Sequence, residues 1–295
     1  MYSEIAEGPE VSVSGVSKCY SNGVQALDDV TLKISSGVFG LLGKNGAGKS
    51  TLMRTLATLQ AADSGEARLG EIDLLTEPMK ARRRIGYLPQ DMGVYPNVSA
   101  RETLQYFAGL KGLGKEVDVF EELARVNLDE VADQRLDTFS GGMKRRFGIA
   151  VAFLGCPDLV IVDEPTAGLD PFERRRFQHF LLSAAENCVL ILSSHIVEDV
   201  ADLASGMAIL HEGKVVADGP PEALVEEIRG KVWSSGVERG DIKAWEEKVE
   251  VLSWRPEAGG HRIRVLASES PGPGFVAVEP DLEDLYACRV GGNRL

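Results

Sequence analysis

Apolar runs of strand length alternate with longer segments of helical period along most of the chain. Three of the runs, Val38–Leu42, Leu159–Val162 and Val189–Leu192, are almost wholly apolar and predict buried strands. Helical periodicity over Lys49–Gln60 follows the first strand, and a helix over Pro171–Glu186 separates the other two. Because helices connect them, the strands should be parallel. The pattern predicts an α/β fold with a mainly parallel sheet.

The segment from Ser99 to Val131 contains no such apolar run and reads as mainly helical. We therefore predict a helical subdomain over about 91–155, projecting from the sheet.

The character of the chain changes after Gly230. All three tryptophans fall beyond this point, together with an alternating "HRIRVLA" and a proline-started helix predicted over Pro280–Cys288. We divide the chain into a main domain over 1–229 and a small α/β accessory domain over 230–295.

Composition narrows the class of protein. With 295 residues, 44% of them hydrophobic, the chain is expected to be globular. The formal net charge of −13 argues against a nucleic-acid partner. The scattered cysteines indicate neither a disulfide framework nor a zinc site, and so fit a reducing compartment. The acidic N-terminus lacks an apolar signal region, and no run reaches the roughly 18 apolar residues of a membrane span, so a cytosolic chain is expected.

The segment "GLLGKNGAGKST" matches the phosphate-binding pattern G-x-x-x-x-G-K-[ST] between a predicted strand and a predicted helix. Glycine leaves backbone N–H groups free to point at phosphate oxygens, and the helix N-terminus adds partial positive charge. Lys49 is expected to reach the β- and γ-phosphates, and the Ser50 hydroxyl to bind Mg²⁺. The alternative without a ligand, a flexible glycine-rich turn, does not explain why a predicted strand precedes the loop and a predicted helix follows it. The expected ATP-contacting residues of the loop are Gly43, Lys44, Asn45, Gly46, Ala47, Gly48, Lys49, Ser50 and Thr51.

"LVIVDEP" supplies two carboxylates at the end of a buried strand. A carboxylate there is costly unless it is paired or binds a metal, so Asp163 is expected to hold Mg²⁺, usually through water. Glu164 is placed to polarise an attacking water. Taken alone, the pair could also be an exposed acidic turn before Pro165.

"FSGGMKRR" predicts a second helix N-terminus that could bind an anion. Ser140 is a good N-cap, and Gly141 and Gly142 leave backbone donors bare. With two phosphate-binding ends and one P-loop lysine, the chain resembles the nucleotide-binding subunit of ABC transporters, whose signature is usually written LSGGQ. In that family the signature of one cassette closes over ATP held by another, in a head-to-tail dimer.

The resemblance covers about residues 10 to 230 and implies further roles by position. Tyr20 would stack on adenine, Gln90 would contact Mg²⁺ and the membrane partner, and His195 would act as the switch on the γ-phosphate. "AGLD", ending in Asp170, resembles the D-loop that links the two sites of the dimer. Without the resemblance, Tyr20 would be a packing tyrosine and His195 an ordinary strand-end histidine.

Three residues depart from the family pattern. Lys44 stands where many relatives have Pro or Ser, and Phe139 and Met143 replace the Leu and Gln of the signature. The Ser140 and Gly142 of the family signature are present, so we expect the chain to hydrolyse ATP.

"RRRIGYLPQDMGVYPNVSARETLQYFAGLKGL" followed by the signature resembles the type 2 exporter group, in which the permease is a separate chain. The resemblance implies a MgATP-driven motor subunit that works as a homodimer or paralogous heterodimer, held at the cytoplasmic face of the membrane by its permease. The alternative is a soluble ABC ATPase acting on ribosomes or DNA. A single cassette and a 49-residue interval between Gln90 and Ser140, too short for a coiled coil, count against it. The C-terminal domain could be a ligand sensor or a structural, dimer-supporting appendage.

Overall fold

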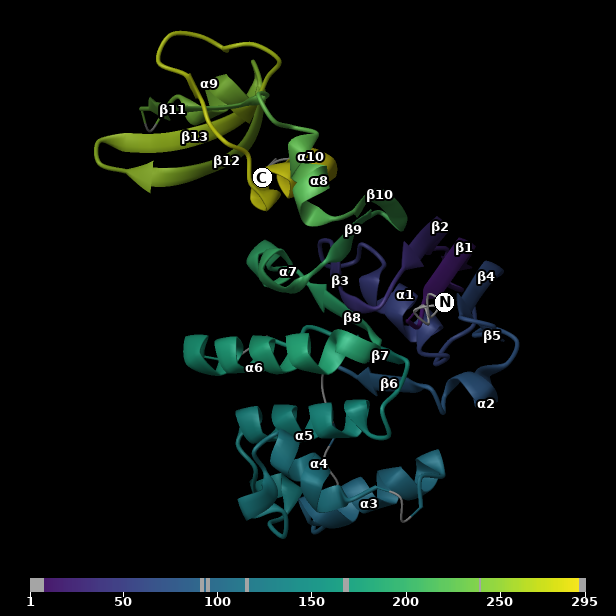
Figure 1. Cartoon of the computed structure of the whole chain (residues 1–295). Coiled ribbons are helices and arrows are strands. Elements are labelled where there is room, and N and C mark those ends of the chain that lie inside the picture. Colours follow the sequence, from purple (N-terminus) through teal and green to yellow (C-terminus); the bar gives the residue numbers. More distant parts are fainter. Residues whose placement is uncertain are drawn as a thin grey trace, which may run out of the picture.

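A computed structural model gives the arrangement of the chain (Figure 1). It describes residues 8–90, 93, 96–114, 117–166, 170–238 and 240–291. Within these ranges the central sheet has six strands in the order β10-β9-β3-β8-β7-β6. Their bounds are β3 Gly37–Leu42, β6 Ile85–Leu88, β7 Leu159–Val162, β8 Val189–Ser194, β9 Gly206–His211 and β10 Lys214–Gly219. All neighbours are parallel except the β9–β10 hairpin, which confirms the predicted mainly parallel sheet.

Both faces of the central sheet are covered, and this explains the continuous apolar runs. In β7, Leu159 and Ile161 pack into one core, whereas Val160 and Val162 pack into the other. The first core lies between the sheet, α1 (Lys49–Leu56) and an antiparallel sheet of order β2-β1-β4-β5. The bounds of that sheet are β1 Val11–Cys19, β2 Gln25–Ile34, β4 Ser64–Leu69 and β5 Ile72–Asp73. The second core is formed mainly by helices.

The helices on the second face run through the middle of the chain. They are α3 Ala100–Lys111, α4 Val119–Arg125, α5 Gly141–Phe153, α6 Pro171–Ala184 and α7 Val197–Leu203. The short α2 (Pro78–Ala81) instead contributes Ala81 to the first core. Ser99 caps α3 through a capping box with Glu102. The described part of 99–131 contains helices and no named strand, as predicted.

Two helix boundaries differ from the prediction. The first helix was expected to reach Gln60 but ends at Leu56, because Thr58 adopts φ 59°, which a right-handed helix cannot contain. The predicted Pro171–Glu186 helix changes to a 3₁₀ turn at Ala185.

The last part of the chain forms an antiparallel sheet of order β12-β13-β11-β14 at the opposite end of the molecule from α3 and α4 (Figure 1). The bounds are β11 Val232–Val237, α9 Ile242–Glu246, β12 Glu250–Glu257, β13 Gly260–Leu266 and β14 Val276–Ala277. Four buried residues make its own small core, with the three tryptophans packed around them: Val251, Ile263, Val265 and Phe275. The division into 1–229 and 230–295 stays a prediction.

The closing helix α10 (Leu282–Val290) packs against α7 and α8 (Pro221–Glu226) of the main body. It was predicted to start at Pro280 but begins two residues later. Asp281 is its N-cap, and the Asp281 carboxylate accepts a hydrogen bond from the backbone N–H of Asp284 at 2.9 Å. Pro280 therefore precedes the cap rather than opening the helix. No helix in the described ranges is both long and apolar enough for a bilayer crossing.

Candidate nucleotide-binding site

The loop predicted to cradle phosphate joins the end of β3 to the first residue of α1. Gly48 is the N-cap of α1 at φ 108°, and Gly46 has φ 82°. Both values are ones that L side chains rarely adopt. The loop therefore turns sharply and presents the N-terminus of α1 at the carboxyl edge of the sheet, where open α/β folds bind ligands.

The glycines of this loop have different reasons to lack a side chain. A Cβ at Gly43 would lie 2.6 Å from the carbonyl oxygen of Leu210, and one at Gly48 would lie 2.4 Å from that of Ala26. At Gly46, by contrast, nothing in the described structure lies within 4 Å of the Cβ position. Packing against neighbouring backbone thus requires Gly43 and Gly48, whereas Gly46 faces open space.

Lys49 is buried at the start of α1, and its Nζ donates to the carbonyl oxygens of Gly43 at 2.5 Å and Lys44 at 3.2 Å. Burial lowers the pKa of this ammonium group, and the nearby Glu164 and Asp163 carboxylates oppose the shift. The charge is therefore held inside the loop, where both carboxylates act on it electrostatically.

Asp163 directly follows β7 and is 5% exposed. The Ser193 hydroxyl donates to Asp163 Oδ1 at 2.6 Å and accepts from the backbone N–H of Glu164 at 2.9 Å. One serine on β8 therefore fixes both members of the carboxylate pair.

Glu164 has φ 47°, a left-handed conformation that is strained for a glutamate. Its side chain lies between two predicted site residues. Gln90 Nε2 donates to Glu164 Oε2 at 3.2 Å, and His195 Nδ1 lies 3.0 Å from Oε1. The structure thus joins Gln90 and His195 through the Glu164 carboxylate, with each residue coming from a different strand end.

Arg145, on α5, holds the backbone around this cluster. Its guanidinium donates to the carbonyl oxygens of Gln90 at 3.1 Å, Pro165 at 2.8 Å and Glu164. Charged donors make the stronger hydrogen bonds in proteins. Sequence reasoning missed this residue, although it lies within the quoted "FSGGMKRR".

The phosphate loop and the side chains of Gln90, Glu164 and His195 line one pocket of about 430 Å³, a volume typical of small-molecule sites. Val24 and Ala26 complete the wall. Of the predicted site residues, the pocket contains Tyr20, Lys44, Asn45, Gly46, Gly48, Lys49, Ser50, Thr51, Gln90, Glu164 and His195. Gly43, Ala47 and Asp163 lie buried just behind the surface.

Tyr20 stands at the rim of this pocket, 37% exposed. Its hydroxyl lies 3.1 Å from Thr51 Oγ1 and donates to Gln60 Oε1 at 3.3 Å. These bonds fix the ring against α1, so that its aromatic surface is available to a flat ligand.

The described signature and D-loop residues do not line this pocket. Ser140 caps α5 by accepting from the backbone N–H of Met143 at 3.2 Å. Asp170 caps α6 by accepting from two backbone N–H groups at 2.9 Å, and Leu169, also assigned to the D-loop, lies outside the described residues. A Cβ at Gly141 would meet nothing within 4 Å in the described structure, so the start of α5 is open at this point.

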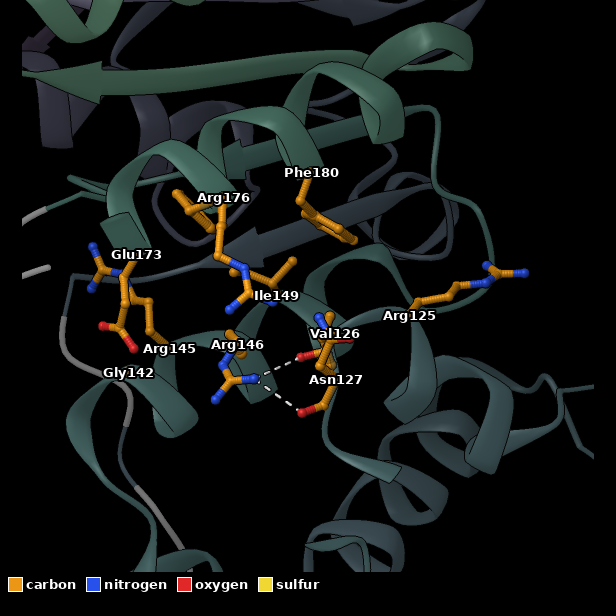
Figure 2. Close-up of a pocket in the computed structure, with 11 residues that line it drawn as sticks. Arg125, Val126, Asn127, Gly142, Arg145, Arg146, Ile149, Glu173, Arg176 and Phe180 are labelled. Carbon is orange, nitrogen blue, oxygen red and sulfur yellow. Dashed lines mark hydrogen bonds between the residues drawn. The ribbon is translucent and has the colours of Figure 1, made fainter. Parts of the chain in front are cut away.

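A second cavity, of about 120 Å³, separates α5 from α6 (Figure 2). Arg146 donates to the carbonyl oxygens of Val126 at 3.3 Å and Asn127 at 3.0 Å, and Arg176 reaches into the gap from α6. Neighbouring arginines of α5 thus serve different surfaces: Arg145 holds the nucleotide-site backbone and Arg146 holds the helical subdomain.

Oxygen donors suited to Mg²⁺ gather at the pocket. They are the Ser50 hydroxyl, the Asp163 carboxylate and the Gln90 amide oxygen. Within the described ranges, no three His, Cys, Asp or Glu side chains form a metal cage. That composition fits Mg²⁺, which is usually bound through one or two carboxylates and by substrate phosphates.

The fold and the pocket together define an ATP-binding P-loop ATPase. The family model described as ABC transporter matches residues 27–167. The linearmycin resistance ATP-binding protein LnrL of Bacillus subtilis (strain 168) is 32% identical over 284 residues, which cover 86% of this chain and 89% of LnrL. The Nod factor export ATP-binding protein I of Rhizobium sp. (strain N33) is 31% identical over 300 residues, covering 95% and 97% of the two chains.

A solved structure described as the ATP-binding subunit of an ABC transporter superposes with a TM-score of 0.67 at 28% identity. The match covers 74% of this chain and 92% of that one. The chain belongs to the ABC transporter family, as an ATP-binding subunit that hydrolyses ATP to drive transport.

Proposed function

We propose that the chain is the motor subunit of an exporter, in which two cassettes close head to tail over two ATP molecules and drive a separate permease chain. The observation that carries this proposal is the separation of the two phosphate-binding ends. The pocket around Lys49 is lined by the P-loop, Gln90, Glu164 and His195, while the described signature residues Ser140 and Gly142 lie outside it. A second cassette would complete each site.

In this proposal the P-loop binds the triphosphate through backbone N–H groups and Lys49, and Tyr20 stacks on adenine. Ser50, Gln90 and Asp163 would hold Mg²⁺, Asp163 usually through water. When it is bound, Mg²⁺ neutralises negative charge on the phosphates.

Glu164 would orient and polarise the water that attacks the γ-phosphate. Its hydrogen bonds to Gln90 and His195 support this role, because they fix a carboxylate that would otherwise rotate. Ser140, Gly141, Gly142 and Asp170 of the partner cassette would contact the same ATP from the other side.

Export as the direction of transport is supported by relatives whose names describe resistance and Nod factor export. The matches to LnrL and the Nod factor protein extend over most of this chain. We accordingly assign residues 230–295 to an accessory domain of the same subunit, which would lie at the cytoplasmic face of the membrane beside its permease.

The test is affinity purification of the Glu164→Gln variant with ATP from detergent-solubilised native membranes, followed by mass spectrometry. A polytopic membrane protein in comparable amount is expected, because the variant should stay closed on ATP and keep its complex intact. The matched control is Glu186→Gln, which changes an exposed carboxylate after α6. Ribosomal or DNA-bound partners without a permease would overturn the proposal.

A further inference from the structure

Asp199 is a buried carboxylate that the roles proposed above do not use. It lies in the first turn of α7, four residues after His195, and is 1% exposed. Isolated buried carboxylates are costly, and both oxygens of this one have polar partners. Asp199 Oδ1 accepts a hydrogen bond from Arg174 Nε at 2.7 Å, and a second nitrogen of the same guanidinium forms an ion pair with it at 2.5 Å. Asp199 Oδ2 accepts from Thr166 Oγ1 at 2.6 Å and from Ser194 Oγ at 3.2 Å.

Each of these donors belongs to a different part of the nucleotide site. Thr166 follows Glu164 by two residues along the chain, and Ser194 directly precedes His195. Arg174 lies in the first turn of α6, four residues after the D-loop Asp170. One carboxylate therefore joins the loop of the proposed base, the loop of the proposed switch and the helix that follows the D-loop.

Stability alone does not account for this arrangement. Replacing a buried ion pair by apolar side chains of similar volume is often neutral or stabilising, because desolvation offsets the attraction between the charges. The Arg174 side chain is 30% exposed and could be solvated without its partner. A network in which both carboxylate oxygens are satisfied instead fixes the geometry of the groups around it.

The backbone at Glu164 needs such support. A strained left-handed residue persists only when its surroundings hold it in several ways. Ser193 holds the N–H of Glu164, and Arg145 holds its carbonyl oxygen. The bond from Thr166 to Asp199 anchors the chain two residues further on.

We propose that Asp199 is a positioning residue for ATP hydrolysis, which keeps the Glu164 loop, the His195 loop and the start of α6 in one arrangement. The inference rests on the hydrolytic roles proposed for Glu164 and His195. It requires no contact between Asp199 and ATP, so binding and turnover should respond differently when the carboxylate is changed.

The experiment measures MgATP hydrolysis by the full-length Asp199→Asn variant, which removes the charge at nearly constant size. The kcat is expected to fall about tenfold or more, while the KM for ATP stays within about twofold. ATP-binding stoichiometry gives the folded fraction, and kcat is calculated per folded site. The matched control, Asp202→Asn, changes an exposed carboxylate on the same helix and should hydrolyse ATP like the parent.

A purely structural role would lower the folded fraction and leave kcat per folded site unchanged, and that result would overturn the proposal. Asp199→Glu, which keeps the charge, is expected to recover part of the lost kcat. Thr166→Val is the milder second variant if Asp199→Asn folds poorly, and it should lower kcat in the same selective way. Unchanged kcat in Thr166→Val would also count against the inference. A parent protein that fails to hydrolyse ATP would instead contradict the proposed function.

Discussion

Gly48 offers a quantitative test of how the phosphate loop is built. Replacing it with alanine places a non-glycine residue at φ 108° and a Cβ 2.4 Å from the carbonyl oxygen of Ala26. The left-handed backbone costs roughly 1–2 kcal/mol, and overpacking against backbone adds roughly 1–3 kcal/mol. The expected loss in the free energy of unfolding is therefore roughly 2–5 kcal/mol.

Gly46→Ala is the matched control, because it shares the positive φ but has open space around its Cβ position in the described structure. Only the backbone cost of roughly 1–2 kcal/mol applies to it. Both variants should bind ATP less well, since both alter the phosphate loop. Only Gly48→Ala should also lose the packing contribution to stability.

The assay is urea unfolding without nucleotide, followed by far-ultraviolet circular dichroism. Tryptophan fluorescence would be the wrong probe, because all three tryptophans pack around the small core of the last sheet and not beside the phosphate loop. With an m-value of about 3 kcal/mol per M, the two midpoints should differ by roughly 0.3–1 M. Equal midpoints for the two variants would refute the argument that close backbone contact requires Gly48.

Three further predictions concern single side chains of the described structure. Ser193→Ala removes the hydrogen-bond donor to Asp163. The free energy of unfolding should fall by about 1–3 kcal/mol, and kcat should fall as well. Unchanged thermal unfolding and turnover would contradict this role. Tyr20→Ala should weaken ATP binding by about 5- to 150-fold, which corresponds to a stacking contribution of roughly 1–3 kcal/mol. Tyr20→Phe keeps the ring and should bind ATP within about twofold of the parent. Equal affinities for the two variants, measured by equilibrium dialysis, would argue against stacking. Burial raises the pKa of the Cys188 thiol to about 11, so that less thiolate forms near pH 8. In the native protein, peptide mass spectrometry should therefore find the exposed Cys156 alkylated well before Cys188. Equal labelling rates at the two cysteines would contradict this prediction.

The sequence predicted those parts of the fold that depend on local pattern. Every residue of β7 is apolar because both faces of the central sheet are covered, and such a run can be recognised without knowing what covers it. The phosphate loop was equally recognisable, since its glycines and lysine are adjacent in the chain.

Helix ends were predicted less well. A proline that opens a helix and one that precedes the cap look alike when only the proline is considered, and at α10 the capping bonds of Asp281 set the start. At α1, the left-handed Thr58 ends the helix although the following residues are compatible with helical periodicity.

Contacts between distant segments could not be predicted. Arg145 and Arg146 are neighbours on α5, and no local signal shows that the first holds Gln90, Glu164 and Pro165 while the second holds Asn127. Asp199 is likewise one of several acidic residues on α7, and only the folded arrangement buries it among Thr166, Arg174 and Ser194.

The most direct test of the central claim is the steady-state rate of MgATP hydrolysis by Glu164→Gln, with ATP affinity measured in parallel. The account predicts a fall in kcat of about 10²- to 10⁴-fold, the typical contribution of a positioned general base, with ATP binding intact. A rate within about tenfold of the parent would correspond to a barrier change below about 1.4 kcal/mol and would contradict the assignment of Glu164 as the residue that activates water.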